Sequence, residues 1–327
     1  MPRILITGIS GFVGGYFTDF LRTNRVDFEI HGISRSKPSW DFIPHSEDLI
    51  KNIVFHQGNL MDIPYIQSVI TEIQPDYIIH LAAQSSVAES WESPISTFLN
   101  NTTIFLNIID SVRRVGNRCK VLSVGSSEQY GIVRENDLPL NESVIQNPSS
   151  PYAVARVSQE NLAKIYADGY QLNICCTRSF NHCGPGQNEK FVVSSIVKQF
   201  AEIALGKKDP VIKIGDGTVI RDFLDIHDVV RAYILLLEKG KRGEIYNVCS
   251  GKGRTIRSII ETLNNLYGIS AGIEEDPSQF RPIDTPKLIG SYAKLNKTVG
   301  WSPEVEFEDS LKSIFHYWCS RLLPHVK

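Results

Sequence analysis

The sequence predicts an α/β protein in which a doubly wound parallel sheet is joined to a smaller, interleaved C-terminal lobe. Three observations indicate this class. The apolar run Ile4–Ile6 leads into a glycine-rich turn and then a helical pattern. Short apolar runs and helical patterns alternate as far as about residue 180. Loops then become frequent. Continuous apolar strands joined by helices are typical of parallel sheets covered on both faces.

The first part of the chain is expected to contain the main sheet and its helices. The predicted strands are Arg3–Thr7, Phe28–Ile33, Ile53–Gln57, Tyr77–His80, Lys120–Val124 and Asn173–Thr177. The predicted helices are Phe12–Thr23, Tyr65–Ile73, Pro94–Val115 and Pro151–Tyr170. Right-handed crossovers between such strands produce a nucleotide-binding (Rossmann) fold.

The second part is expected to be more irregular. We predict helices at Phe191–Leu205, Asp225–Glu238, Thr255–Tyr267 and Phe307–Leu322, strands at Val211–Ile214 and Glu244–Val248, a turn at Gly215–Gly217 and a loop at Arg281–Ser291. The strand Glu244–Val248 can rejoin the main sheet. We therefore expect a dinucleotide-binding domain at residues 1–180 plus about 222–250, and a smaller substrate-binding lobe at 181–221 and 251–327. The ligand cleft would lie between them.

Composition excludes several classes of protein. A net charge of −2 gives no sign of a nucleic-acid partner, and no apolar run approaches membrane-spanning length. The N-terminus begins with a predicted strand and has no secretory pattern. The six cysteines have no C-x-x-C spacing and no metal-ligand pattern, so we expect reduced thiols, no metal site and a cytoplasmic location.

The glycine-rich turn has the spacing G-x-x-G-x-x-G. Gly8 permits the sharp backbone turn, Gly11 lets a pyrophosphate approach closely, and Gly14 allows tight helix–strand packing. The N–H groups at the start of the following helix would face the phosphates. A turn that binds no ligand is the alternative interpretation.

Two further segments carry groups suited to acid–base chemistry. Tyr152 and Arg156 lie on one face of a predicted helix, where a cation can stabilise a tyrosine phenolate. Ser126, Ser127 and Glu128 follow a predicted strand, at the edge where open α/β sheets place ligands. From these residues alone, an exposed Tyr–Arg pair and serines that merely cap a turn remain open.

The segment after the second predicted strand indicates the cofactor. NAD enzymes usually place a carboxylate here to hold the ribose, and none is present in Ser34–Lys37. Arg35, with Ser34 or Ser36, could hold a 2′-phosphate instead. This favours NADP(H) over NAD(H), with a solvated basic loop as the alternative.

Across nearly its whole length the chain resembles the extended short-chain dehydrogenases/reductases that act on nucleotide sugars. The matching segments are the glycine turn, His80–Ser86, Gly125–Gly131, Ser150–Tyr152, Arg178–His182, Gly184–Gln187, Arg221–Phe223, Tyr246–Ser250, Arg281–Pro282 and Leu288–Ser291. Within that group it is most similar to GDP-4-keto-6-deoxy-mannose reductases and next to GDP-mannose 4,6-dehydratases. The Ser-Ser-Glu triplet is closer to the reductases, because the dehydratases usually have Thr at the position of Ser126.

The resemblance implies roles for individual residues. Tyr152 would exchange the proton of the sugar C4 oxygen, Ser126 would hydrogen-bond that oxygen, and Glu128 occupies the position of the dehydratases' acid/base. Asn101 matches an asparagine that supports the tyrosine region. The remaining implied cofactor contacts are Phe12, Val13, Asn59, Leu60, Leu81, Ala82 and Ala83, besides the three glycines, Arg35, Tyr152 and Arg156. The implied substrate contacts are Ser86, Ser127, Asn181, Lys190, Arg221, Arg281 and Asp284, with Arg221 and Arg281 on the diphosphate.

Several residues depart from the family pattern. Arg156 replaces a lysine that normally bonds the nicotinamide ribose. Arginine keeps the positive charge at this position, but the geometry of the contact with the ribose and the relay of a proton are expected to differ. Ile104 stands where a glycine is common. Asn59 replaces an Asp near the adenine, and Asp284 replaces a longer Glu on the nucleotide ribose.

The leading hypothesis is NAD(P)-dependent hydride exchange at C4 of a GDP-linked sugar, with GDP-4-keto-6-deoxy-mannose reductase as the best specific assignment. The alternatives are a GDP-mannose 4,6-dehydratase, a GDP-manno-sugar or GDP-heptose 4-dehydrogenase that retains its cofactor, and a non-catalytic nucleotide sensor. Relatives commonly pair through the two long helices Pro94–Val115 and Pro151–Tyr170, so a homodimer or higher homo-oligomer is expected.

Overall fold

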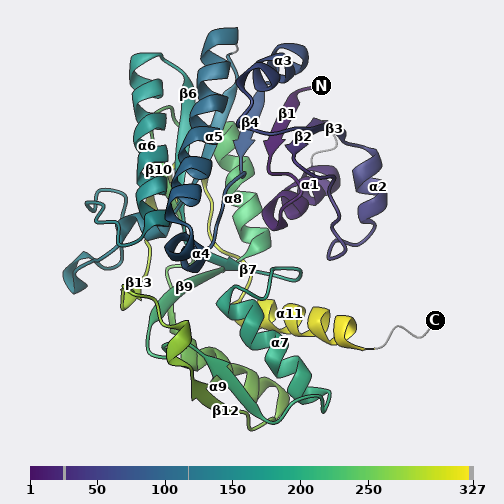
Figure 1. Cartoon of the computed structure of the whole chain (residues 1–327), viewed down its shortest axis with the longest axis vertical. Coiled ribbons are helices and arrows are strands. Elements are labelled where there is room, and N and C mark those ends of the chain that lie inside the picture. The colour runs from purple at the N-terminus through teal and green to yellow at the C-terminus, as the bar shows by residue number, and fades with distance from the viewer. Residues whose placement is uncertain (25–26, 117, 324–327) are drawn as a thin grey trace.

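A computed structural model describes residues 1–24, 27–116 and 118–323, and its central sheet confirms the predicted α/β class (Figure 1). The sheet has the strand order β10-β6-β5-β4-β1-β2-β3, and each neighbouring pair is parallel. Its strands are β1 (Arg3–Thr7), β2 (Glu29–Ser34), β3 (Val54–Gln57), β4 (Tyr77–His80), β5 (Lys120–Ser126), β6 (Asn173–Ser179) and β10 (Ile245–Val248). The order reverses between β1 and β4, which creates a crevice at the carboxyl ends of these strands.

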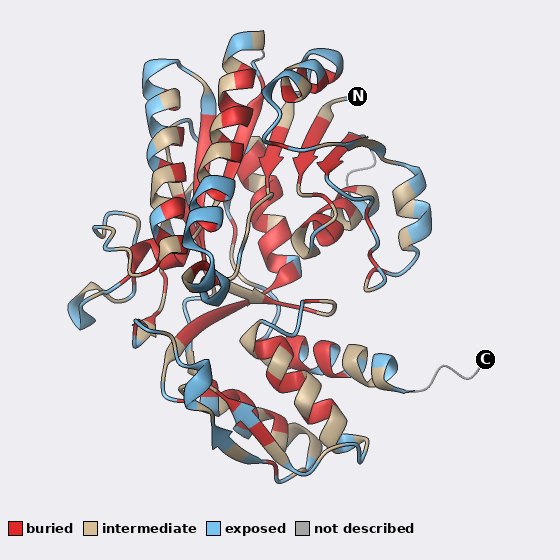
Figure 2. Ribbon diagram, viewed as in Figure 1, coloured by how far each residue is buried: buried red, intermediate tan, exposed pale blue. Residues whose placement is uncertain are grey.

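Helices cover both faces of this sheet (Figure 2). One face packs against α1 (Phe12–Asn24), α8 (Ile226–Lys239) and α10 (Ala293–Val299), and the other against α3 (Ile63–Ile73), α5 (Pro94–Val115) and α6 (Pro151–Gly169). Strand β1 shows the alternation, since Ile4 and Ile6 belong to the first core while Leu5 belongs to the second. Short helix α2 (Ser46–Lys51) packs Leu49 and Ile50 against the first of these cores, and short helix α4 (Val87–Glu92) precedes α5 (Figure 1).

Local sequence signals fix the starts of the two long helices. Ser150 caps the start of α6, since its hydroxyl accepts the Ala153 N–H at 3.1 Å. Pro151 follows in the first helical position. Helix α5 begins at Pro94 and ends before Gly116, which adopts a left-handed conformation. Proline fits the first turn because it has no N–H to satisfy there, and glycine adopts the left-handed cap without strain.

The smaller part of the molecule lies below the sheet in Figure 1. It contains β7 (Asn181–Cys183), α7 (Val192–Ala204), β8 (Val211–Ile214), β9 (Ile220–Asp225), β11 (Gly253–Thr255), α9 (Ile256–Tyr267), β12 (Gly272–Glu275), β13 (Lys287–Leu288) and α11 (Phe307–Leu322). Strand β9 pairs with β7, β11 and β13, and β8 pairs with β12. A separate apolar core around Phe200, Ile259 and Leu311 holds these elements together.

The structure corrects several sequence predictions in this part. Arg281–Ser291 is not all loop, because Lys287–Leu288 forms β13 beside β9. Strand β9 occupies the segment before the predicted helix, which begins at Ile226 rather than Asp225. The elements α2, α4, α10, β7, β11 and β12 were not predicted either. These segments are too short for a periodic apolar pattern, and the strands among them are stabilised by pairing with distant segments.

The strand predicted at Glu244–Val248 is confirmed, since β10 joins the edge of the main sheet beside β6. The predicted domain boundaries stay a prediction, and residues 324–327 of the second range lie outside the described residues. Among the described residues, no helix is both long enough and apolar enough to cross a membrane.

Candidate active site

The glycine turn between β1 and α1 has the geometry of a phosphate cradle. Gly8 has φ +72°, and a Cβ there would lie 2.7 Å from Cα and N of Ala82. A Cβ on Gly14 would lie 2.4 Å from the Ile9 carbonyl oxygen, so helix and turn pack too tightly for any side chain. The Leu81 N–H donates to the Thr7 carbonyl at 3.2 Å, which holds the 81–83 segment beside the turn. The residues present therefore fit a dinucleotide pyrophosphate at the start of α1.

The neighbouring residues predicted to contact the cofactor differ in their exposure and in the hydrogen bonds that they already make within the protein. Arg35 and Lys37 are exposed on the turn after β2, but the Ser34 hydroxyl donates to the Ser36 carbonyl at 2.7 Å. Asn59 is exposed, and its side-chain oxygen accepts the Met61 N–H at 3.1 Å. Leu60 is buried and its carbonyl accepts from Asn107. A basic rather than acidic surface thus follows β2.

Phe12 and Val13 begin α1 directly after the glycine turn. The Phe12 ring stacks at a centroid distance of 6.4 Å on His182 of β7, in the smaller part of the molecule. The glycine turn is therefore in contact with both parts.

Tyr152 and Arg156 come together on α6, as their spacing predicts. Both are buried, and the guanidinium carbon lies 5.2 Å from the centroid of the tyrosine ring. Arg156 Nη1 also donates to the Val124 carbonyl on β5 at 3.1 Å. This places the pair near the carboxyl end of β5, the strand that ends at Ser126.

Ser126 ends β5 and caps the 3-10 turn η1 (Ser127–Tyr130). Its hydroxyl accepts the Glu128 N–H at 3.2 Å, so the serine has the local capping role that the sequence left open. Ser127 and Glu128 on this turn are both buried. A hydroxyl that accepts from the backbone still has its own O–H free to donate to a ligand oxygen.

A buried polar network, which sequence reasoning missed, holds this turn in place. Gln129 accepts the Ser126 N–H at 2.9 Å and donates to Glu160 at 2.8 Å. Glu160 in turn accepts two hydrogen bonds from Arg178, at 2.8 and 2.9 Å. Because an unpaired buried carboxylate is strongly unfavourable, each member of this network fixes the next. No sequence spacing marks it, since its members come from η1, α6 and β6.

The predicted substrate residues form an ion-pair cluster with Glu128. Arg281 Nη1 lies 3.2 Å from Glu128 Oε1 and 3.4 Å from Asp284 Oδ1, and Asp284 also accepts from Arg221. Arg221 is buried, and its Nη1 donates to the carbonyls of Ile220 and Thr285. Two arginines predicted to hold a diphosphate are thus brought together, with two carboxylates bound to them.

The other predicted residues have local roles or are at most partly buried. Ser86 caps α4, and Asn101 exchanges two hydrogen bonds with the backbone of Gln84, which supports the segment after β4. Asn181 is half-buried on β7, whereas Lys190 is exposed on the following loop and takes no part in the arginine cluster. Across residues 1–24, 27–116 and 118–323, no cluster of three or more metal-ligating side chains occurs.

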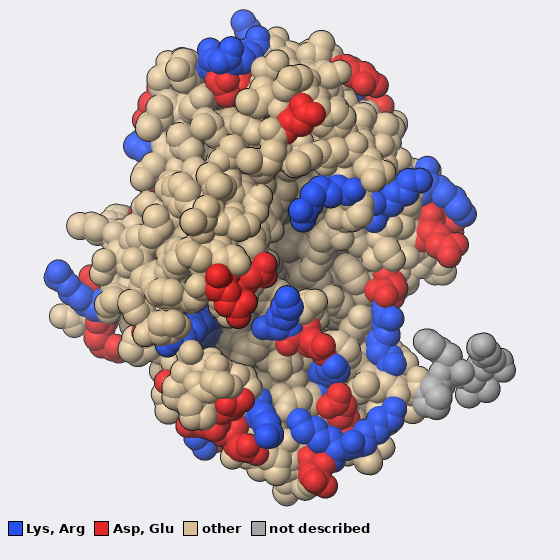
Figure 3. Space-filling view, viewed as in Figure 1, with Lys and Arg blue, Asp and Glu red and all other residues tan. Residues whose placement is uncertain are grey.

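A hollow separates the sheet part from the smaller part on the face shown in Figure 3. Basic and acidic side chains gather along its rim. Charged rims of both signs around a concave site suit a ligand with anionic phosphates and polar hydroxyls.

Comparisons with known proteins agree with this fold and site. A model of the GDP-mannose 4,6-dehydratase family matches residues 5–314. The chain is 33% identical to the GDP-6-deoxy-D-mannose reductase of Pseudomonas aeruginosa, covering 98% of each protein, and 30% identical to the GDP-mannose 4,6-dehydratase of Yersinia enterocolitica, covering 94% of this chain and 91% of the relative.

Solved structures show the same architecture. A Pseudomonas aeruginosa protein, RMD, complexed with NADPH matches with a TM-score of 0.86 at 32% identity, covering 98% of this chain and all of that one (100%). The Thermotoga maritima UDP-glucose 4-epimerase with UDP-glucose matches with a TM-score of 0.86 at 28% identity, over 98% of this chain and 100% of that one. The fold and site define an enzyme of the extended short-chain dehydrogenase/reductase class. Within it, the chain belongs to the GDP-mannose 4,6-dehydratase family.

Proposed function

We propose that this protein exchanges hydride at C4 of a GDP-linked sugar, with NADP(H) as the favoured cofactor, and acts as a GDP-4-keto-6-deoxy-mannose reductase. The observation that carries the proposal is the Tyr152–Arg156 pair, with a guanidinium carbon 5.2 Å from the ring centroid, beside the strand that ends at Ser126. Its similarity to the Pseudomonas aeruginosa GDP-6-deoxy-D-mannose reductase supports the choice of substrate.

In the proposed reaction, side chains of the protein donate the proton and stabilise the charge that remains. Tyr152 donates its hydroxyl proton to the C4 oxygen as the ketone becomes an alcohol, and Arg156 stabilises the phenolate that is left. Ser126 donates a hydrogen bond to the same oxygen and orients it. When bound, the reduced nicotinamide supplies the hydride that C4 receives.

The glycine cradle and Arg35 support the cofactor assignment. The backbone N–H groups of Phe12 and Val13 would face the pyrophosphate, and Arg35 would face the 2′-phosphate. Leu81, Ala82 and Ala83 would line the path from the turn toward the nicotinamide. Support also comes from the NADPH in the similar RMD structure, although other relatives in the group were solved with NAD.

The arginine cluster supports a nucleoside diphosphate substrate. Arg281 and Arg221 would exchange part of their bonds to Glu128 and Asp284 for phosphate oxygens. Asn181 and Lys190, from β7 and the loop after it, would extend the same channel. Ser86 and Ser127 would contact the sugar.

The second candidate is a GDP-mannose 4,6-dehydratase, favoured by Glu128 and by the relatives of that name. A dehydratase needs a carboxylate free to move a proton at C5 and C6. Glu128 is paired with Arg281 here, but a bound diphosphate would draw Arg281 away, so the pairing does not decide between the two functions. The reductase is favoured by the Ser-Ser-Glu triplet at 126–128 and by the 33% identity to the GDP-6-deoxy-D-mannose reductase.

One pair of incubations distinguishes these functions. With GDP-4-keto-6-deoxy-mannose and NADPH, a reductase lowers the absorbance of the reduced nicotinamide. With GDP-mannose and an equimolar amount of oxidised cofactor, a dehydratase yields a product lighter by one water and leaves the cofactor oxidised. A 4-dehydrogenase yields a ketone without loss of water and reduces one cofactor per sugar. Nucleotide binding without turnover in either mixture would overturn the proposal in favour of a sensor.

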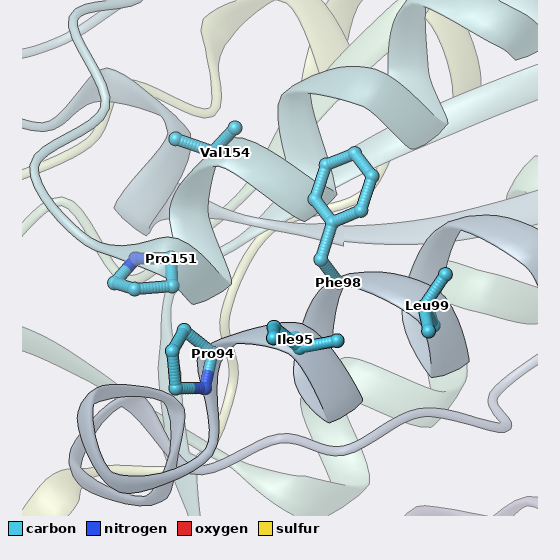
Figure 4. Close-up of a pocket in the computed structure, with 6 residues that line it drawn as sticks. All are labelled: Pro94, Ile95, Phe98, Leu99, Pro151 and Val154. Atoms are coloured by element: carbon cyan, nitrogen blue, oxygen red, sulfur yellow. The ribbon is translucent and has the colours of Figure 1, made fainter.

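We also propose a homodimer formed through α5 and α6. Figure 4 shows apolar side chains around a shallow cavity of about 400 Å³, lined by Pro94, Ile95, Phe98, Leu99, Pro151 and Val154. Ile95 is 76% exposed and Leu99 49% exposed, which is unfavourable for apolar side chains gathered on one face.

The six free cysteines fit a reducing compartment such as the cytoplasm.

A further inference from the structure

Arg156, the residue that departs most from the family pattern, is held by a specific neighbour. Its Nη1 donates to Gln159 Oε1 at 2.7 Å, a shorter bond than the one to the Val124 carbonyl at 3.1 Å. Its Nε is buried and bonds to no other described atom. The position of the guanidinium therefore depends on what Nη1 contacts.

Gln159 is itself locked in one orientation. It is 1% exposed, and its Nε2 donates to Ser123 Oγ at 2.8 Å and to the Val124 carbonyl at 3.2 Å. Because the nitrogen end meets acceptors on β5, the oxygen end must face Arg156. One carboxamide thus connects β5 to the guanidinium of Arg156.

We propose that Gln159 is a positioning residue that holds Arg156 against the face of Tyr152. The proposal rests on the proposed function, in which Tyr152 exchanges the proton at C4. A neutral acceptor is suited to this position, since it fixes the guanidinium without cancelling the charge that stabilises the phenolate. A glutamate at position 159 would bond Arg156 equally well, but its negative charge would offset most of the positive charge that stabilises the phenolate.

The groups packed around Arg156 do not neutralise the positive charge of its guanidinium. From β4, His80 is buried, and burial and then the positive charge of Arg156 lower its pKa to about 3, so its ring is neutral. From α8, Tyr233 bonds to Ser179, and burial raises its pKa to about 12. Along α6, Glu160 is occupied by Arg178. From β5, Ser123 and Val124 contribute only uncharged groups.

The experiment compares Gln159→Glu, Gln159→Met and wild-type protein by ultraviolet titration of the free enzyme. Each spectrum is corrected with the matching Tyr152→Phe variant, because the chain has 12 tyrosines. We expect Gln159→Glu to move the ionisation midpoint of Tyr152 upward by at least about one pH unit, a tenfold change in its ionisation constant. Gln159→Met should move it upward by less, as Arg156 relaxes. The alkaline side of the pH–rate profile should shift in the same order.

Gln171→Glu is the matched control, since Gln171 lies exposed just beyond α6 and should leave the titration unchanged. A wild-type midpoint in Gln159→Glu would overturn the proposal. If that variant does not fold, a wild-type midpoint in Gln159→Met would overturn it instead. Absence of turnover with every sugar would refute the proposed function, whereas turnover with an unmoved titration would refute only this inference.

Discussion

At the scale of single residues, Tyr152 is the side chain on which the proposed chemistry depends. Replacing it with Phe removes the transferable proton and keeps the ring against Arg156. We expect turnover to fall by about 10²–10⁴-fold, the usual contribution of general acid–base catalysis. GDP affinity, measured by calorimetry, should stay near that of the wild type. Near wild-type turnover in this variant would remove Tyr152 from the proposed role.

Glu128 makes a competing contact with the arginine expected to bind phosphate. Its carboxylate is 3.2 Å from Arg281 Nη1, so a diphosphate must displace it before binding fully. We expect Glu128→Gln to bind GDP about two- to fivefold more tightly, because a partly exposed ion pair contributes up to about 1 kcal/mol. Turnover should not improve, since Glu128 belongs to the proposed substrate site.

Glu135→Gln is the control for that measurement. The Glu135 side chain is 75% exposed and forms its ion pair with Lys287 rather than with Arg221 or Arg281. It should leave GDP affinity unchanged, as measured by the same titration. Weaker GDP binding in Glu128→Gln would mean that the carboxylate organises Arg281 for phosphate rather than competing with it.

Arg35 should determine the choice of cofactor. In Arg35→Asp, the carboxylate would repel a 2′-phosphate and could accept the ribose hydroxyl instead. We expect the ratio of NADPH to NADH dissociation constants to shift toward NADH, as measured by fluorescence titration. Lys37→Asp on the same exposed turn tests whether any negative charge has this effect. An unchanged ratio in Arg35→Asp would assign the phosphate to another residue.

At the scale of elements, the sequence predicts what local signals encode. The caps and prolines of α5 and α6 mark where those helices begin, and the spacing of Tyr152 and Arg156 places both on one face. Gln159 could have been found in the same way, since three residues beyond Arg156 is again the same face. The glycine turn was predictable because the positions of Gly8 and Gly14 leave no room for a side chain.

Contacts between distant elements could not be predicted in this way. The Glu160–Arg178 pair joins α6 to β6, and Arg221 reaches Asp284 across 63 residues of sequence. Neither pair leaves a periodic pattern, because only the folded arrangement brings the partners together. For the same reason, β9 and the two-residue β13 were missed, since each is stabilised by pairing rather than by its own composition.

At the scale of the whole molecule, the apolar face of α5 and α6 should determine the oligomeric state. Ile95→Asp would place a charge in the centre of that face, so we expect the mass measured by light scattering to fall from dimer to monomer. Ile132→Asp is the control, because Ile132 is 54% exposed but lies outside both helices. A wild-type protein that is already monomeric at micromolar concentration would contradict the dimer.

Stability should fall in mild acid because of a buried histidine. His80 bonds to Thr7 through Nδ1 at 2.9 Å, and its pKa is lowered from 6.5 to about 3, first by burial. The unfolded chain therefore binds a proton that the folded protein excludes. The stabilisation is complete above pH 6.5 and is lost as pH falls from there toward 3, by at most about 1.4 kcal/mol per pH unit from this residue.

Denaturant unfolding at several pH values tests this expectation. His80→Asn keeps a hydrogen-bonding group near Thr7 and cannot be protonated, so its stability should decline less between pH 6.5 and about pH 4.5. In that interval the histidine of the unfolded chain takes up a proton while the buried His80 stays neutral. His31, His56 and His182 also have lowered pKa values and should leave some slope in both proteins. His316→Asn, at an exposed position, is the control. Equal slopes in His80→Asn and wild type would contradict the assignment.

The position of β10 has a consequence for synthesis on the ribosome. The main sheet receives its last strand from residues 245–248, after β7, α7, β8, β9 and α8 have been made. Until then the outer edge of β6 has unpaired N–H and C=O groups, which are prone to pair with other chains. At about 5–20 residues per second, the nascent chain carries this open edge for several seconds while the intervening 65 residues, 180–244, emerge. A chain ended by a premature stop anywhere in this interval would keep that edge and be directed toward aggregation or proteolysis.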